Sequence, residues 1–175
     1  MKKDNWTIKI IIMAFTISLI FSSLSETIIP KVNTIISIII LIIFIIIGII
    51  FDMIGVAVTT CDIKPFHSMN SKKIDYSKTA ISLIKNGAKV SSFCNDVIGD
   101  ICGIISGGTG IVIAANISNK LNTNAILTNL IITSIIAALT IGGKALGKTK
   151  ALNNNTKIVK TFSKIIHFFT KKLSK

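Results

Sequence analysis

The sequence predicts an all-α integral membrane protein, a bundle of four transmembrane helices with amphipathic helices on the cytoplasmic side. Half of its 175 residues are apolar, and its mean hydropathy is +0.73. Long apolar runs recur along the chain, and a helix needs about 20 such residues to cross a bilayer. A transmembrane domain is therefore expected over residues 1–152, with spans at residues 10–29, 32–60, 92–117 and 125–143.

The distribution of lysines predicts how these spans are oriented. All 20 basic residues are lysines. Three precede the first span, six lie between the second and third, and nine follow the fourth, whereas the two remaining connections hold one lysine each, Lys31 and Lys120. Because cytoplasmic segments are enriched in positive charge, we expect a multi-pass protein with both termini and the loop at residues 62–90 in the cytoplasm. The lack of arginine and the many Ile, Lys and Asn residues are typical of an AT-rich bacterial genome, so the predicted location is a bacterial inner membrane.

The first span follows a short basic tail and ends near Glu26 and Pro30. It also has the features of a signal peptide, because a basic start and an apolar core precede small residues near Ser25 that would suit cleavage. Cleavage would leave three spans, so the sequence leaves these two alternatives open.

The second span, residues 32–60, is longer than the hydrocarbon core and has Asp52 towards its inner end. In the loop that follows, residues 71–85 have helical spacing of apolar side chains and are expected to form a short amphipathic helix along the inner leaflet. The connection between the third and fourth spans is short and polar. These two spans are therefore expected to pack as an antiparallel hairpin.

Residues 153–175 predict a basic amphipathic helix at the C-terminal end. Its apolar side chains follow helical spacing, and its lysines occupy the other side. We expect this helix to lie on anionic lipids of the inner leaflet. The net charge of +13 does not indicate nucleic-acid binding, because arginine is the preferred residue for contacting bases and phosphates. The apolar positions of this predicted C-terminal helix are Ile158, Phe162, Ile165, Ile166, Phe169 and Leu173.

Three aspartates are expected at similar depth near the cytoplasmic ends of the spans, which predicts a cation site. Asp96 and Asp100 are four residues apart at the start of the third span, and positions i and i+4 share one face of a helix. Hard divalent cations such as Mg²⁺ bind oxygen ligands and keep several waters. The predicted metal ligands are Asp96 and Asp100, assisted by Asn95, Asp52 and Ser106.

Two other interpretations of these charges remain open. Asp52 and Asp96 would also be stable as hydrated residues at helix ends, where a carboxylate in the first turn is favoured by the helix dipole. Alternatively, Lys144 at the inner end of the fourth span would neutralise one of them in a structural ion pair.

Gly99, Gly103 and Gly107 form a four-residue repeat on the third span. Small residues let helices approach closely in lipid, so this stripe predicts helix packing. The three cysteines are scattered and are expected to be reduced packing residues. Neither histidine falls in a span near a candidate nucleophile, so we do not expect an enzyme.

Several segments, taken in order, resemble the transmembrane domain of the CNNM/CorC (CorB-like) family of magnesium and cobalt transporters. FDMIGVAVTTCDIK at residues 51–64 is similar to the end of that family's first helix, and TAISLIKNGAKV at residues 79–90 to a loop segment of the form A-x-x-L-I-x-N. Residues 91–107 resemble its second helix, with Asn95 near a Gly-Asn motif. GKALGKTKAL at residues 143–152 resembles a G-E-x-x-P-K segment, although lysine and glycine replace the Glu and Pro.

The resemblance implies transport or binding of Mg²⁺ or Co²⁺ by a homodimer, with the ion as the only bound group and without the family's CBS domains. It also leaves the first span as an addition to the family's pattern. The alternative function is a non-transporting interaction or scaffold protein that packs through the Gly99, Gly103 and Gly107 stripe.

Overall fold

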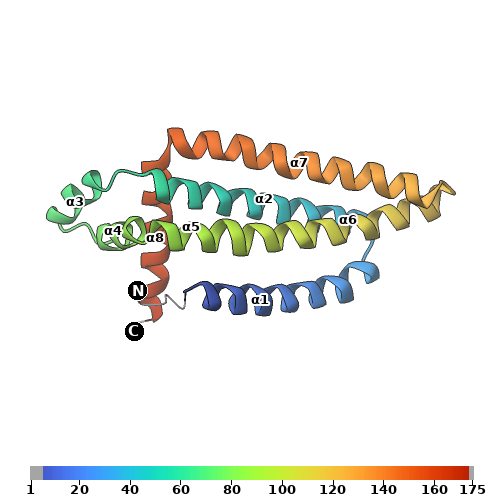
Figure 1. Cartoon of the computed structure of the whole chain (residues 1–175), viewed down its shortest axis with the longest axis horizontal. Coiled ribbons are helices and arrows are strands. Elements are labelled where there is room, and N and C mark those ends of the chain that lie inside the picture. Colours follow the sequence, from blue (N-terminus) through green and yellow to red (C-terminus); the bar gives the residue numbers. More distant parts are fainter. Residues whose placement is uncertain (1–5, 174–175) are drawn as a thin grey trace. The chain divides into compact units, whose positions relative to one another are not determined.

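The computed structural model of the chain describes residues 6–173, with side chains described to residue 171, and every element in that range is a helix (Figure 1). The tail before residue 6, Lys175 and the side chains of Lys172 and Leu173, which belong to the predicted basic ends, lie outside the described residues. Among the described residues, four helices are long and apolar enough to cross a membrane. The all-helical class and the number of such helices are as the sequence predicts.

The first two of these helices are joined by a tight connection. α1 covers Trp6–Ile28 and continues into η1, a 3-10 helix over Ile29–Lys31, and α2 covers Thr34–Thr60. Pro30 lies at the start of η1, where its missing N–H costs nothing. The mean hydropathy of α2, 3.4 over its most apolar window, is higher than that of the other three.

The third long helix, Gly87–Leu121, is built from three consecutive elements. α5 covers Gly87–Ser92, η2 is a π-helix over Phe93–Gly99, and α6 covers Asp100–Leu121. Asn122 ends α6 in the left-handed conformation, with a φ of 52°. After this turn α7 covers Ala125–Asn153 and runs past the predicted end at residue 143. No proline interrupts residues 144–153, so the helix has no reason to stop there.

The chain folds as two compact units, residues 1–49 with 97–144 and residues 50–96 with 145–175. In the first unit α1 packs against α6 and has no fully buried residue. One cluster of buried apolar residues in this unit contains Leu41, Ile45, Ile113 and Ile136. Most other large side chains on its helices are exposed, which suits helices surrounded by lipid.

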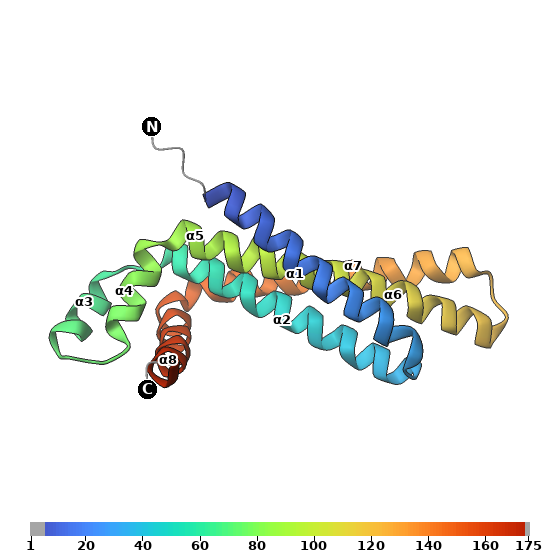
Figure 2. The same ribbon diagram turned by 90° about the horizontal axis from the view of Figure 1, so that it is seen from below.

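The second unit contains the end of α2, the end of α7, α5, most of η2 and three further helices. α3 covers Lys64–Ser71, α4 covers Ser77–Lys85 and α8 covers Asn155–Leu173. α4 packs against α8, and α8 runs crosswise to the end of α2 in both views (Figures 1 and 2). Phe66, Ala80, Ala151 and Val159 are fully buried in the core that these elements share.

The amphipathic helix predicted over residues 71–85 is shorter in the structure, where its helical part is α4, Ser77–Lys85. A turn separates α3 from α4, and Lys73 adopts a positive φ of 56° in it. The apolar side chains of α4 also have a different environment from the one expected at the inner leaflet. Ala80 is fully buried, and Ile81 and Ile84 pack against the same core, because α8 covers the face that was expected on the leaflet.

Candidate functional site

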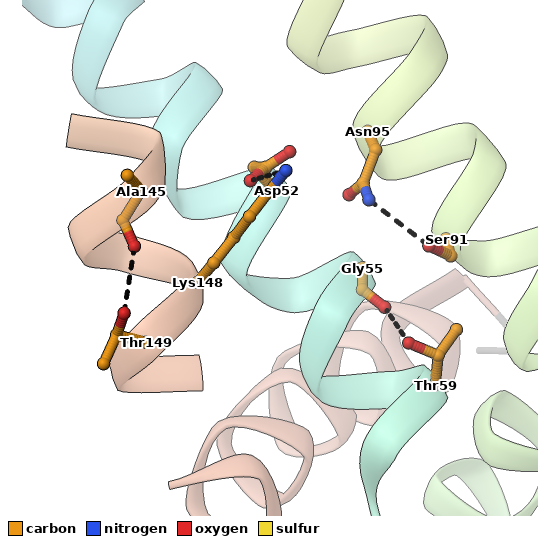
Figure 3. A network of polar contacts seen from close by, with 8 residues as sticks. All are labelled: Asp52, Gly55, Thr59, Ser91, Asn95, Ala145, Lys148 and Thr149. Atoms are coloured by element: carbon orange, nitrogen blue, oxygen red, sulfur yellow. Dashed lines mark hydrogen bonds and ion pairs between the residues drawn. The ribbon is translucent and has the colours of Figure 1, made fainter. Parts of the chain in front are cut away.

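A buried carboxylate lies near the C-terminal end of α2, within the second unit. Asp52 is only 4% exposed, and its Oδ2 atom lies 3.7 Å from Nζ of Lys148 on α7 (Figure 3). This distance exceeds hydrogen-bonding range. No hydrogen bond reaches Asp52 Oδ2 from the residues that the structure describes. The lysine therefore balances the charge of Asp52 while one carboxylate oxygen still lacks a hydrogen-bond donor.

The helix beside α2 contributes a second polar side chain, Asn95, from the π-helix η2. Its Nδ2 donates a hydrogen bond to Ser91 Oγ at 3.3 Å. Its Oδ1 is buried and has no hydrogen-bond partner within the described part of the chain. π-Helical turns are rare and occur often at functional sites, and a buried acceptor without a partner is costly. Asn95 is thus a candidate for binding a ligand.

Gly55 is the point at which the Asn95 side chain approaches α2. It lies three residues after Asp52, so both are on one face of α2. A Cβ atom at Gly55 would clash with the Asn95 amide, which shows that the amide approaches the α2 backbone directly. Glycine is required for such an approach. The Asn95 amide accordingly points towards the side of α2 that has Asp52 (Figure 3).

The Asp52 site thus consists of two oxygen acceptors, Asp52 Oδ2 on α2 and Asn95 Oδ1 on the neighbouring helix, that lack hydrogen-bond donors among the described residues. Carboxylate and amide oxygens are the ligands of hard cations. Lys148 provides a positive charge at the same carboxylate, and its side chain is 51% exposed. The charge of the buried carboxylate is therefore balanced by a side chain that also reaches water.

The other predicted ligands have different environments. Asp96 and Asp100 are both exposed, although the sequence ranks them as principal ligands. Ser106 is buried in the first unit, and its Oγ donates a hydrogen bond to the Cys102 carbonyl at 2.7 Å. Of the five predicted ligands, Asp52 and Asn95 are therefore the two that have a buried oxygen without a hydrogen bond.

The lysine that pairs with Asp52 is Lys148, whereas the sequence suggests Lys144 as the partner of an aspartate. The two lysines are four residues apart, or about one helical turn. The difference arises because α7 continues to Asn153, whereas the predicted span ends at residue 143. The lack of a proline directly after Gly143 is the sequence feature that would have extended the predicted helix to Lys148.

Two of the three glycines in the predicted stripe have open space beside them in the described part of the chain. A Cβ atom at Gly103 or Gly107 would meet nothing within 4 Å, and Gly99 is buried. Close contacts between helices of the first unit occur instead at other glycines. A Cβ atom at Gly48, for example, would lie 3.2 Å from the Cβ atom of Cys102. Packing of the stripe against another chain stays a prediction.

Among the described residues, His, Cys, Asp and Glu side chains do not form a group of three that could hold a metal ion. The oxygens of the Asp52 site come from one carboxylate and one amide. Comparison with known proteins gives no match to any family model, curated protein or solved structure.

Proposed function

We propose that this chain is a multi-pass protein of a bacterial inner membrane that binds a divalent cation, Mg²⁺ first and Co²⁺ second, and passes it across the membrane. The supporting observation is the pair of buried oxygens without a hydrogen bond, Asp52 Oδ2 and Asn95 Oδ1. Mg²⁺ usually keeps several waters and takes few protein ligands. One carboxylate and one amide are therefore a sufficient protein contribution when water completes the coordination shell.

Lys148 provides a way for a cation to bind at Asp52 in exchange for the lysine ammonium group. Without a metal ion, the ammonium group neutralises the buried Asp52 carboxylate, whose isolated charge would be costly. An incoming cation repels the ammonium group, and the half-exposed lysine side chain turns towards water. Cation and ammonium then alternate at the same carboxylate, so the site is never left with an uncompensated buried charge.

The resemblance to the CNNM/CorC transmembrane domain supports Mg²⁺ and Co²⁺ as the ions. Asn95 lies near that family's Gly-Asn motif, and Lys148 corresponds to the lysine of its G-E-x-x-P-K segment. Asp52 lies in the segment 51–64, so the proposed site involves residues from three of the segments that carry the resemblance.

Mg²⁺ flux into liposomes that contain the full-length chain and a Mg²⁺-sensitive dye tests the proposal. We expect Asp52→Asn to reduce the initial rate at least tenfold, because the amide lacks the charge that attracts the cation. Asp100→Asn is the matched control, since Asp100 is an exposed carboxylate and should retain most of the flux.

The two variants distinguish ligands at the Asp52 site from the ligands that the sequence ranks first. Loss of flux in Asp100→Asn but not in Asp52→Asn would support the ligands ranked first by sequence and reject the Asp52 site. Equal flux in liposomes with and without the wild-type chain would reject transport altogether.

The second candidate function is a non-transporting interaction protein, and the open positions Gly103 and Gly107 favour it. Self-association through this stripe would give the homodimer that the resemblance implies. Gly103→Leu should then abolish cross-linking of two copies in membranes, whereas Asp52→Asn should leave cross-linking unchanged.

A further inference from the structure

An apolar groove of about 310 Å³ lies between the end of α2 and α8, within the second unit. Ile50 and Met53 line it from α2, and Ile158 and Ile165 line it from α8. Lys157 and Thr161 are exposed residues of α8 at the same groove. Its lining is therefore hydrocarbon with one cationic group.

The charges that α8 brings to the groove are of one sign. α8 contains five lysines and no acidic residue. Of these lysines, Lys164 lies over the Tyr76 ring and Lys171 pairs with Asp75, on the side of α8 that faces α4. Lys157 belongs instead to the groove. An occupant that complements both features needs an apolar chain and a negative group.

The position of the groove indicates which class of amphiphilic molecule could occupy it. Ile50 and Met53 belong to the last turns of a helix long and apolar enough to cross a membrane, and α8 crosses that end of α2 (Figure 2). The groove therefore lies where acyl chains meet headgroups if α2 spans a bilayer. An apolar groove is a poor site for water. A second copy of the chain would bring another lysine-rich α8 against Lys157, which charge repulsion disfavours.

We propose that this groove binds one acyl chain of an anionic phospholipid, with the headgroup phosphate paired to Lys157. The lipid fills the space between α2 and α8 and so fixes the crosswise helix at the membrane surface. The groove requires α2 to lie in a membrane, as in the proposed function, but does not require a cation at Asp52.

Native mass spectrometry of the full-length chain tests this site. The protein is taken up in a mild non-ionic detergent with an equimolar mixture of phosphatidylglycerol and phosphatidylcholine, in the presence of a metal chelator. We expect one retained phosphatidylglycerol per chain and at least a fivefold preference over phosphatidylcholine. The chelator makes the result independent of the proposed cation site.

Two variants with matched controls identify the groove. Thr161→Trp should fill it and abolish lipid retention, whereas Thr170→Trp, at an exposed position of the same helix, should not. Lys157→Glu should remove the preference for phosphatidylglycerol, whereas Lys85→Glu, at an exposed lysine of α4, should keep it. Lys157 is exposed, so its replacement tests the site even if Thr161→Trp fails to fold.

Three results would overturn the proposal. The first is equal retention of the two lipids by the wild-type chain, and the second is wild-type lipid retention by a folded Thr161→Trp variant. The third is binding of many lipids per chain that does not saturate and shows no distinct first lipid. The last result would indicate non-specific adsorption to the apolar helices.

Discussion

Gly55 and Gly103 differ in what a methyl group would meet, and this difference decides the effect of each replacement. Gly55 faces the Asn95 amide directly, whereas Gly103 faces open space. In Gly55→Ala the amide must turn away from α2 and strain or break its hydrogen bond to Ser91. In Gly103→Ala no neighbour has to move, and alanine favours the helix.

We therefore expect Gly55→Ala to lower the free energy of unfolding by about 1 to 3 kcal/mol. Gly103→Ala should leave it unchanged or raise it by up to about 1 kcal/mol. Urea unfolding in detergent, followed by circular dichroism, measures both. Equal stability of the two variants would contradict the close contact between Gly55 and Asn95.

Cys61, directly after α2, provides a pH-dependent prediction. Burial raises the pKa of the Cys61 thiol, and a hydrogen bond with Thr156 offsets part of that rise. The unfolded chain therefore loses this proton at lower pH than the folded chain. The resulting contribution to stability is fully present below the ordinary thiol pKa and is lost as the pH rises through the raised pKa.

Alkylation of Cys61 measures this effect in a chain with Cys94→Ala and Cys102→Ala. The pH midpoint of the alkylation rate should be higher for the folded chain than for the same chain in denaturant. Replacement of Thr156 by Val should raise the midpoint further. Coincident midpoints in the folded and unfolded chains would show that the thiol is exposed to water in the folded protein.

Single residues also show where sequence reasoning succeeds and where it stops. The polarity of Asp52 and Asn95 in apolar surroundings identifies them as candidates. Their ranking against Asp96 and Asp100 depends on helical register, and the π-helix over Phe93–Gly99 has more residues per turn than the α-helix assumed for the i, i+4 spacing. No sequence pattern signals that change of register.

At the scale of helices, the junction between the end of α2 and the start of α8 depends on Asn155. Its Nδ2 donates to the Thr60 carbonyl at 3.0 Å, and its Oδ1 accepts from the Thr156 N–H at 2.6 Å. The first bond satisfies a carbonyl at the end of α2, and the second satisfies an N–H at the start of α8, groups that lack partners within their helices. Asn155 therefore holds the ends of two helices together.

We expect Asn155→Ala to increase opening of this junction several-fold, because each hydrogen bond contributes about 0.5 to 1.5 kcal/mol. Limited trypsin digestion at Lys150 and Lys157 measures the opening. Asn154→Ala is the control, because its side chain bonds only the Lys150 carbonyl of its own helix at 3.4 Å among the described contacts. Equal cleavage of both variants would exclude the role of Asn155.

The amphipathic pattern predicts α8 well but not which of its residues are buried. Val159 and Ser163 are fully buried, although neither belongs to the predicted apolar set. Ile165 and Phe169, which do, are 49% and 59% exposed. The reason is that α8 packs against α4, so its buried side is set by a neighbouring helix as well as by its own periodicity.

For the whole molecule, the number of long apolar helices follows from the sequence, because each is defined by its own length and composition. How they pack does not follow, since that depends on a few close contacts. Gly110 faces Ile136 and Gly143 faces Ile49 so closely that an added Cβ atom would clash. These pairs are far apart in the sequence, and apolar residues of similar size surround them, so hydropathy alone does not identify them.

The number of spans makes a prediction about the orientation of the whole chain. If all four long helices cross the membrane, both ends lie on one side, together with the connection that contains α3 and α4. The lysine distribution predicts that this side is the cytoplasm. Green fluorescent protein fused to the C-terminus should therefore fluoresce, and alkaline phosphatase should be active when inserted after Asn122 but inactive at the C-terminus.

An epitope tag at the N-terminus separates this arrangement from cleavage of the first span. Four spans require that the tag stay on the full-length protein and be accessible from the cytoplasm. Cleavage near Ser25 would remove the tag and shorten the chain, but it would leave the C-terminal reporters unchanged, because three spans would still end in the cytoplasm. Loss of the tag would thus show that α1 is removed and that the mature bundle has three helices. Active phosphatase at the C-terminus would instead contradict the orientation itself.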